Sequence, residues 1–212
     1  FAISSHEKAF NADKNGNFKD EITIIHNQNN EVSKDGGIRA GTTQDILNGL
    51  KLAFDNKGTV TAGTSSPLTD GAAATLICEE EYAKKNNLDI LARIKSSAVN
   101  GCEPEVMGLG PIGASKKALN RAGINSSELD VIELNEAFAS QSLACVKDLG
   151  LDPKNVNIDG GAIALGHPLG ATGARITGKA AQLLRREGKK YALATQCIGL
   201  GQGIATVLET VE

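Results

Sequence analysis

Residues 157–175 read Asn-Ile-Asp-Gly-Gly-Ala-Ile-Ala-Leu-Gly-His-Pro-Leu-Gly-Ala-Thr-Gly-Ala-Arg, and five of these nineteen residues are glycine. Glycine destabilises regular structure, and it is used where the backbone needs a positive φ or approaches another group closely. The segment that follows, Ile176 to Glu187, has its apolar residues at helical spacing. The pattern predicts a strand, then a glycine-rich loop that holds His167, then a helix.

A second loop of this kind follows the apolar run Tyr191–Ala194 and reads Thr195-Gln196-Cys197-Ile198-Gly199-Leu200-Gly201-Gln202-Gly203. Active sites in open α/β sheets commonly combine a reactive side chain at a strand end with a loop of free backbone N–H groups. His167 and Cys197 are therefore a candidate acid–base and thiol pair. Simpler interpretations remain open, namely a packed histidine and a buried cysteine that serves only packing. Packing is the favoured role of the remaining cysteines, which are Cys78, Cys102 and Cys145.

Composition narrows the class of protein. The chain has 212 residues, of which 41% are hydrophobic, and this is enough for a substantial core. A formal net charge of -3 offers no basic surface for nucleic acid or an anionic membrane. No apolar run approaches the roughly 18 residues of a membrane span, and no signal-peptide pattern is visible. The four cysteines lack C-x-x-C spacing, so we expect no metal site, no disulfide framework and a reducing, cytoplasmic compartment.

Strand and helix patterns alternate through the second half of the chain. Strands are predicted near 94–99, 131–134, 156–158, 191–196 and 204–211, with helices from about 114 to Gly123, from 135 to Gly150 and after 172. This βαβαβαββ series predicts an α/β fold with a mostly parallel sheet and helices on both faces. Ligands of such sheets bind beyond the strand ends, where Asn135, His167 and Cys197 are expected. Earlier in the chain, we expect a helix from Gln44 to about Phe54 and a buried strand at 72–78.

Several of these groups are suited to stabilising negative charge. A neutral His167 can donate to an oxyanion, and Asn135 can donate directly or hold a water that does, so that together they would stabilise an enolate. The N–H of Gly199 can serve a second oxyanion. A thiol has an ordinary pKa of about 8.5, and a modest lowering would let Cys197 exchange protons near neutrality. Carbon–carbon chemistry beside a thioester also needs a thiol nucleophile, for which the sequence offers no candidate.

Three blocks of the sequence resemble signatures of the thiolase family: Asn135-Glu136-Ala137-Phe138, Gly-Gly-Ala-Ile-Ala-Leu-Gly-His-Pro at 160–168, and Cys197-Ile198-Gly199. A fourth block, Thr-Val-Thr-Ala-Gly-Thr-Ser-Ser at 59–66 with Asp-Gly-Ala-Ala-Ala at 70–74, resembles another. The resemblance covers nearly the whole chain. With Leu200 where many members carry glycine, the chain is most similar to the degradative 3-ketoacyl-CoA thiolases, or acetyl-CoA C-acyltransferases, of bacterial fatty-acid β-oxidation.

The resemblance implies a thiolase-like fold and thiolysis, in which CoA cleaves a 3-ketoacyl-CoA into acetyl-CoA and an acyl-CoA shortened by two carbons. CoA is then a substrate, and no separate cofactor is implied. By position in the blocks, His167 would contribute to the enolate oxyanion hole and help to activate the nucleophile, and Asn135 would anchor the water of that hole. Cys197 would transfer protons. The N–H of Gly199 would face the tetrahedral intermediate of the acyl-enzyme.

The resemblance also implies residues that bind the substrate. Ser66 matches a serine that contacts pantetheine, while Met107 and Phe138 match residues that line the acyl or pantetheine pocket. Arg39 stands where the family's loop domain meets the CoA nucleotide, although a solvated surface charge explains it equally well. The family further implies a homo-oligomer and allows for a β-oxidation multienzyme as a partner.

One departure from the family is large. Family members carry their nucleophilic cysteine in an N-terminal half, in a Cys-Ser-Ser-Gly-like context that these 212 residues lack. We therefore expect the chain to be the C-terminal portion of a thiolase, partnered by the missing N-terminal half and inactive alone. The expected division is 1–57 as the tail of the loop domain, 58–89 as the last part of the N-terminal domain and 90–212 as the C-terminal domain.

Three other functions remain open. They are an acetoacetyl-CoA-forming biosynthetic thiolase, a related condensing enzyme or carrier-protein synthase, and a non-catalytic module that binds CoA or lipid. The combination of Asn135, His167 and Cys197 argues against the last of these, because a binding module has no need of a proton-transferring cysteine.

Overall fold

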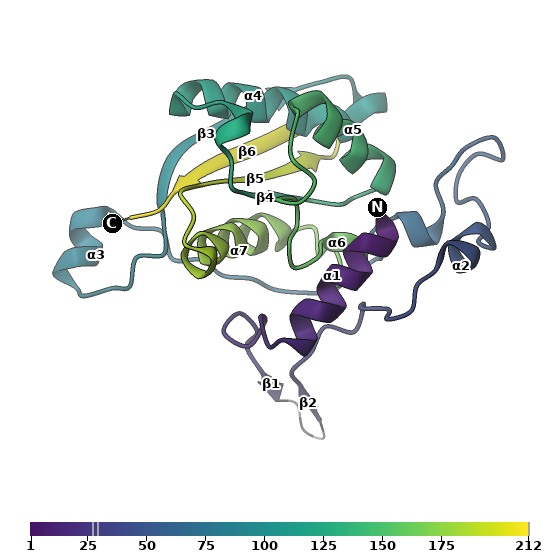
Figure 1. Cartoon of the computed structure of the whole chain (residues 1–212), viewed down its shortest axis with the longest axis horizontal. Helices are drawn as coiled ribbons and strands as arrows, with labels where there is room; N and C mark the ends of the chain where they lie inside the picture. Colours follow the sequence, from purple (N-terminus) through teal and green to yellow (C-terminus); the bar gives the residue numbers. More distant parts are fainter. Residues whose placement is uncertain (27, 29, 212) are drawn as a thin grey trace.

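The computed structural model describes residues 1–26, 28 and 30–211. Its centre is a mixed sheet in the strand order β3-β6-β5-β4 (Figure 1). The strand bounds are Arg93–Gly101 for β3, Val131–Leu134 for β4, Tyr191–Ile198 for β5 and Gln202–Glu209 for β6. β6 runs antiparallel to both of its neighbours, whereas β4 and β5 pair in parallel.

The prediction of a mostly parallel sheet is wrong, and the reason lies in the connection between β5 and β6. Residues 199–201 form a short turn in which Leu200 and Gly201 have positive φ values of 68° and 90°. A turn this short can join only antiparallel strands, because a parallel pair needs a crossover of about a dozen residues or more. The strand expected at 156–158 is reduced to one parallel bridge, between Ile132 and Val156.

β3, β4 and β5 nevertheless all point in the same direction. β3 and β5 are each antiparallel to β6, and β4 is parallel to β5. Their carboxyl ends therefore meet at one edge of the sheet, as they would in a wholly parallel sheet. The residues that follow these three strands are thereby brought to the same side of the molecule.

Helices cover both faces of the sheet, as predicted. α4 and α5 pack on one face, and α7 packs on the other (Figure 1). Their bounds are Gly110–Ala122 for α4, Ala139–Leu149 for α5 and Thr172–Glu187 for α7. Strand side chains alternate between the two cores: Leu134 and Leu193 join the core under α4 and α5, and Val131 and Ala194 join the core under α7.

Each of these three helices ends at a glycine in the left-handed conformation. The glycines are Gly123 with φ 70°, Gly150 with φ 62° and Gly188 with φ 60°. A left-handed glycine lets the chain leave the helix while its N–H groups satisfy the last carbonyls. The predicted helix ends at Gly123 and Gly150 are confirmed. Within the described residues, no helix has the length and apolar character needed to span a bilayer.

The first ninety residues consist of short elements joined by long connections. Their bounds are Ala2–Lys14 for α1, Ile25–His26 for β1, Glu31–Val32 for β2, Gln44–Asn48 for α2, Ala62–Thr64 for η1 and Glu80–Lys85 for α3. β1 and β2 pair with each other in a small antiparallel ribbon. α1 packs on α6 (Ala162–Leu165), which stands just before the His167 loop (Figure 1).

Two predictions for this part of the chain are wrong. The helix that Thr43 caps ends at Asn48 rather than near Phe54, and the Phe54 side chain is exposed. The expected buried strand at 72–78 is absent: these residues form no helix or strand and pair with no described strand, and the Leu76 side chain is 79% exposed. An apolar run indicates a strand only where a neighbouring strand supplies the hydrogen bonds.

The start of β6 crosses the start of α4 at two glycines. A Cβ added to Gly203 would overlap the backbone carbonyl of Gly110, and a Cβ added to Gly110 would overlap the carbonyl of Gln202. Because the obstacle on each side is backbone, it cannot turn away as a flexible side chain could. This crossing fixes α4 against the sheet beside the site edge.

The substitution Gly203→Ala should therefore lower the free energy of unfolding by about 3 kcal/mol, since the added methyl forces the two backbones apart. Gly170→Ala is the matched control, because a Cβ there would meet no atom within 4 Å. Urea denaturation of both variants measures the effect. Equal stabilities of the two variants would show that the crossing yields without cost.

Candidate active site

The carboxyl ends of β4 and β5 lie side by side. Leu134, the last residue of β4, pairs with Thr195 of β5, and the backbone N–H of Asn135 donates to the Thr195 carbonyl at 2.9 Å. Asn135 is almost completely buried, with 1% of its surface exposed. The backbone of Asn135 is therefore held against β5, the strand whose end carries Cys197.

The His167 imidazole reaches Asn135 from the loop between α6 and α7. Its Nε2 lies 3.3 Å from Nδ2 of Asn135, and its Nδ1 lies 2.7 Å from Oγ1 of Thr172. The backbone N–H of His167 donates to Oγ1 of Thr69 at 3.2 Å. The imidazole is thus held at both ring nitrogens, and its backbone is anchored from a distant part of the chain.

The surroundings of the His167 side chain favour its neutral imidazole form. Burial, and the positive charge of Arg175, lower the pKa of His167 below its ordinary value of 6.5. A neutral imidazole keeps a lone pair on one nitrogen and can accept a proton from a thiol. Once protonated, the same nitrogen can donate to an oxyanion.

Cys197 lies at the end of β5 with only 7% of its surface exposed. Burial raises the pKa of the Cys197 thiol above its ordinary range, in the direction opposite to the lowering that would favour proton exchange near neutrality. The reason is that a thiolate inside the protein loses its hydration, and none of the described neighbours compensates with a positive charge. Its Sγ makes no described hydrogen bond to Asn135 or His167. Asn135 and His167 are therefore in contact with each other, and Cys197 shares their sheet edge without a described bond to either.

Gly199 occupies the exposed turn that follows Cys197. A Cβ added there would find open space, so no steric reason in this chain requires glycine at this position. The residue is exposed.

Ser66 and Phe138 are neighbours. The N–H and the hydroxyl of Ser66 both donate to the carbonyl of Ala137, at 3.0 and 3.3 Å, and Ser65 forms an antiparallel bridge with Phe138. The Phe138 ring makes an edge-to-face contact with Phe54, with ring centroids 6.3 Å apart. Ala137 and Phe138 belong to the short segment that joins β4 to α5 and that begins with Asn135. Ser66 therefore contacts the same segment that carries Asn135.

Met107 and Arg39 are placed differently. Met107 is half-buried in η2 (Pro104–Leu109), which follows β3 and packs on α5. The Arg39 side chain is exposed, and the described hydrogen bonds of its backbone run to His6 of α1 and to Thr42. The structure therefore joins Arg39 to α1 rather than to the other candidate residues.

Sequence reasoning missed Thr69 and Thr172, which hold His167. Thr172 is fully buried at the start of α7, and its hydroxyl donates to the carbonyl of Pro168 at 3.0 Å. A hydroxyl four residues after a carbonyl commonly makes this bond in a first helical turn. That spacing was a usable signal for Thr172, whereas nothing in the sequence connects Thr69 to a histidine 98 residues away.

A buried carboxyl, Glu133, lies two residues before Asn135 on β4. Burial raises the pKa of Glu133 to about 8, although the positive charges of Arg175 and Lys179 on α7 act in the opposite direction. Its Oε1 accepts no hydrogen bond from the part of the chain that the structure describes. The carboxyl is therefore largely protonated at pH 7, which avoids the cost of an unpaired buried charge.

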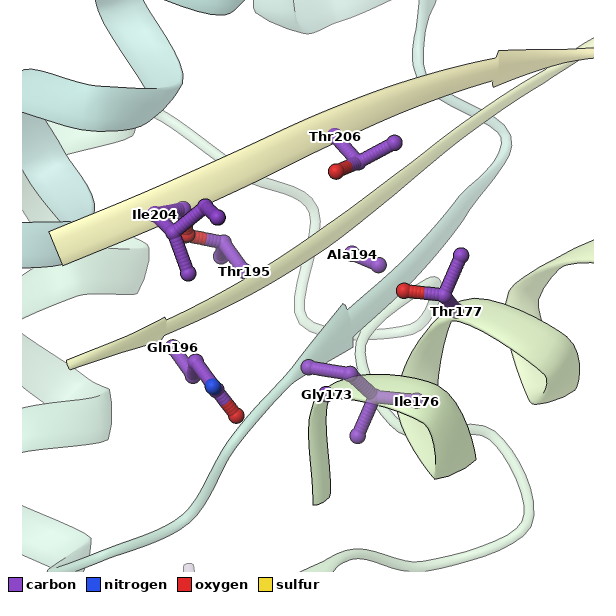
Figure 2. A pocket seen from close by; sticks show the side chains of 8 residues that line it. All are labelled: Gly173, Ile176, Thr177, Ala194, Thr195, Gln196, Ile204 and Thr206. Carbon is purple, nitrogen blue, oxygen red and sulfur yellow. The ribbon is translucent and has the colours of Figure 1, made fainter. Parts of the chain in front are cut away.

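A cavity of about 200 Å³ lies between α7 and the strands β5 and β6. Figure 2 shows its lining, to which α7 contributes Gly173, Ile176 and Thr177 and β5 contributes Gln196 beside the start of that helix. Asn135, His167 and Cys197 do not line it, so the cavity is distinct from the sheet-edge site. Among the described side chains, no group of three histidines, cysteines or carboxylates is placed to hold a metal ion.

These features define an α/β protein with an imidazole and an amide in contact at one sheet edge and a thiol at the end of the neighbouring strand. Residues 88–210 match the family model for the thiolase C-terminal domain, and residues 1–81 match the model for the thiolase N-terminal domain. The chain belongs to the thiolase family. The division of residues 1–89 between a loop domain and an N-terminal domain stays a prediction.

Curated relatives are named 3-ketoacyl-CoA thiolase. The chain is 54% identical over 220 residues to the protein of Shewanella frigidimarina, and 52% identical over 221 residues to that of Enterobacter sp.. In both cases the alignment covers 100% of this chain and 57% of the relative. The chain thus spans little more than half the length of the relatives it matches.

Solved structures agree with these relatives. Human mitochondrial 3-ketoacyl-CoA thiolase superposes with a TM-score of 0.93 at 41% identity, covering 100% of this chain and 54% of that one. The Bacillus anthracis acetyl-CoA acetyltransferase superposes with a TM-score of 0.94 at 42% identity, covering 99% and 54%. The human enzyme has also been crystallised in complex with CoA. The fold is therefore thiolase-like.

The raised pKa of Glu133 predicts how stability depends on pH. In the unfolded chain this carboxyl loses its proton near 4.5, whereas in the folded chain it keeps the proton up to about 8. The folded state then binds more protons over this range, so stability falls as pH rises. Glu133→Gln removes this loss and should raise the free energy of unfolding by about 1–3 kcal/mol at pH 7, with a smaller gain near pH 5. Urea denaturation across this pH range measures it, and a gain that did not change with pH would contradict the assignment.

Glu136→Gln should have the opposite effect and serves as the contrasting variant. The Glu136 carboxylate accepts hydrogen bonds from Ser5 Oγ at 2.6 Å, from Asn157 Nδ2 at 2.7 Å and from the N–H of Ile163 at 3.1 Å. An amide has one acceptor oxygen and places an NH₂ group against a donor. Stability at pH 7 should fall by about 2 kcal/mol.

Proposed function

We propose that this chain supplies the oxyanion-binding and proton-transferring part of a 3-ketoacyl-CoA thiolase, which cleaves a 3-ketoacyl-CoA with CoA to give acetyl-CoA and a shortened acyl-CoA. The contact of 3.3 Å between Asn135 Nδ2 and His167 Nε2 carries the proposal. This contact places two groups that can bind an enolate oxygen together at the sheet edge, in a chain that belongs to the thiolase family.

In the first step, a cysteine from the N-terminal half of the enzyme gives its thiol proton to Nε2 of His167. The thiolate attacks the keto carbon of the substrate, and the bond between that carbon and the α-carbon breaks. The electron pair of the broken bond passes to the acetyl-CoA enolate. The protonated Nε2, with a water held by Asn135, then donates hydrogen bonds to the enolate oxygen.

In the second step, Cys197 donates its proton to the enolate carbon and acetyl-CoA leaves. The raised pKa of Cys197 supports this role, because the thiol is the protonated form at neutral pH. The thiolate so formed takes the proton of incoming CoA, whose sulfur attacks the acyl-enzyme and leaves as the shortened acyl-CoA. The displaced cysteine thiolate then takes back the proton held by Nε2 of His167. The N–H of Gly199 faces the oxyanion of that second tetrahedral intermediate.

Four residues complete the proposal as contacts of the substrate. Ser66, Met107 and Phe138 border the pantetheine and acyl chain, and their positions around the start of α5 support this role. Arg39 is proposed at the CoA nucleotide, and its exposed side chain is free to reach a ligand. The whole enzyme is proposed to act in the cytoplasm as a homo-oligomer, in fatty-acid degradation.

A biosynthetic thiolase that forms acetoacetyl-CoA is the second candidate. It is favoured by the likeness to the Bacillus anthracis acetyl-CoA acetyltransferase, which at 42% identity is as similar as the human 3-ketoacyl-CoA thiolase. Comparing turnover of acetoacetyl-CoA with that of longer 3-ketoacyl-CoA substrates separates the two functions. A preference for the longer chains supports the degradative assignment.

A chimeric enzyme tests the proposal. Residues 1–212 replace the matching 57% of the Shewanella frigidimarina protein, and acetyl-CoA release from a 3-ketoacyl-CoA and CoA is measured. We expect turnover by the chimera and none by the isolated chain, which lacks the nucleophile. His167→Ala and Cys197→Ala should each lower kcat by about 100-fold or more, because each removes a proton-transfer group.

Cys78→Ala is the matched control, since Cys78 is an exposed thiol outside the site, and its turnover should equal that of the unaltered chimera. Turnover that survives Cys197→Ala would overturn the proton-transfer role. A folded chimera that binds CoA without cleaving the substrate would instead indicate a binding module.

A further inference from the structure

Thr172 lies where it can decide which nitrogen of His167 carries the proton. Its hydroxyl is fully buried, so it must find its partners inside the protein. Two partners are in reach: the carbonyl of Pro168 at 3.0 Å and Nδ1 of His167 at 2.7 Å. A hydroxyl has one proton to donate and lone pairs to accept with.

The carbonyl of Pro168 can only accept, so the Thr172 hydroxyl donates to it and accepts from Nδ1–H of His167. Nε2 then carries the lone pair and accepts from the Asn135 NH₂ group at 3.3 Å. This arrangement makes three hydrogen bonds. In the opposite tautomer, the Thr172 hydroxyl must donate to Nδ1 and so loses its bond to the Pro168 carbonyl. Nε2–H then needs an acceptor, so the Asn135 side-chain amide must rotate to present its oxygen. That arrangement makes two hydrogen bonds.

We propose that Thr172 is a positioning residue that holds neutral His167 in the Nδ1–H tautomer, so that the lone pair of Nε2 faces Asn135 and the sheet edge. The consequence for catalysis rests on the proposed function, in which Nε2 must carry no proton of its own if it is to take the proton of the thiol nucleophile. With the proton on Nε2 instead, the imidazole could not act as a base from that nitrogen, and its lone pair would point into the α7 turn.

The lowered pKa of His167 is consistent with a group that is neutral at working pH. The anchor at Thr69 complements Thr172, because it fixes the backbone of His167 while Thr172 fixes the ring. Oγ1 of Thr69 in turn donates to the carbonyl of Pro67 at 2.7 Å, which directs its lone pair toward the His167 N–H.

The tautomer is measured directly by long-range ¹H–¹⁵N correlation of the imidazole rings in the ¹⁵N-labelled chain. The chain has three histidines, and the loss of one set of signals in His167→Gln assigns those of His167. In the unaltered chain at pH 8, we expect Nδ1 to show the shift of a protonated nitrogen and Nε2 that of a nitrogen with a lone pair. The reverse pattern would overturn the proposal.

Thr172→Val removes the hydroxyl while nearly preserving its volume, and Thr172→Ser keeps the hydroxyl. In Thr172→Val, we expect the proton to move toward Nε2, because Nδ1 then faces a methyl group. In Thr172→Ser, the original pattern should return. If Thr172→Val loses its fold, as judged by its amide spectrum, the unaltered chain and Thr172→Ser still decide the tautomer. An unchanged tautomer in a folded Thr172→Val variant refutes the positioning role.

Kinetics of the chimeric enzyme separate this inference from the proposed function. Thr172→Val should lower kcat by about 10- to 100-fold with little change in KM, and Thr172→Ser should recover most of the loss. A chimera without thiolysis whose His167 still shows the Nδ1–H tautomer refutes the proposed function and leaves the tautomer assignment in place. A chimera in which Thr172→Val turns over normally refutes the positioning role and leaves the function in place.

Discussion

A buried carboxylate, Glu136, connects the three segments that build the site. It accepts hydrogen bonds from Ser5 of α1, from the side chain of Asn157 and from the N–H of Ile163 at the start of α6. Asn157 in turn bonds both the N–H and the carbonyl of Leu134, each at 2.9 Å, and so takes the place of a strand partner where β4 ends. These bonds hold Asn135 and the His167 loop in one fixed relation, because neither segment can move without leaving a buried polar group unpaired.

The glycines that precede α6 let the chain pass very close to α1 and to the Glu136 side chain. A Cβ on Gly161 would overlap the Glu136 carboxylate, and a Cβ on Gly160 would meet α1, while the φ of Gly160 is 84°. The loop can therefore pass between α1 and the end of β4 only with hydrogen at both positions. Burial of the Glu136 side chain raises the pKa of its carboxyl. The same burial results from the close packing of the loop that places His167 beside Asn135.

The electrostatics of the site follow from burial more than from charge pairs. His167, Glu133 and Cys197 all shift toward their neutral forms, and loss of hydration is the first cause in each case. Arg175 adds a positive charge that favours neutral His167 and opposes neutral Glu133. An interior of neutral imidazole, carboxyl and thiol is suited to chemistry in which protons move only when substrate charge develops.

The family was predictable from the sequence because whole blocks around Asn135, His167 and Cys197 resemble those of thiolases. The helix ends at Gly123 and Gly150 were predictable because glycine and periodicity signals act over a few residues. The alternation of strands and helices placed Asn135, His167 and Cys197 beyond strand ends. Strand direction was not predictable in the same way: a three-residue turn inverted β6, and the run at 72–78 found no described strand to pair with. The partners of His167 and the raised pKa of Cys197 were also decided by tertiary structure. Hydration and hydrogen-bond partners depend on what surrounds a group in space, and for His167 and Thr69 that neighbour is 98 residues away in the chain.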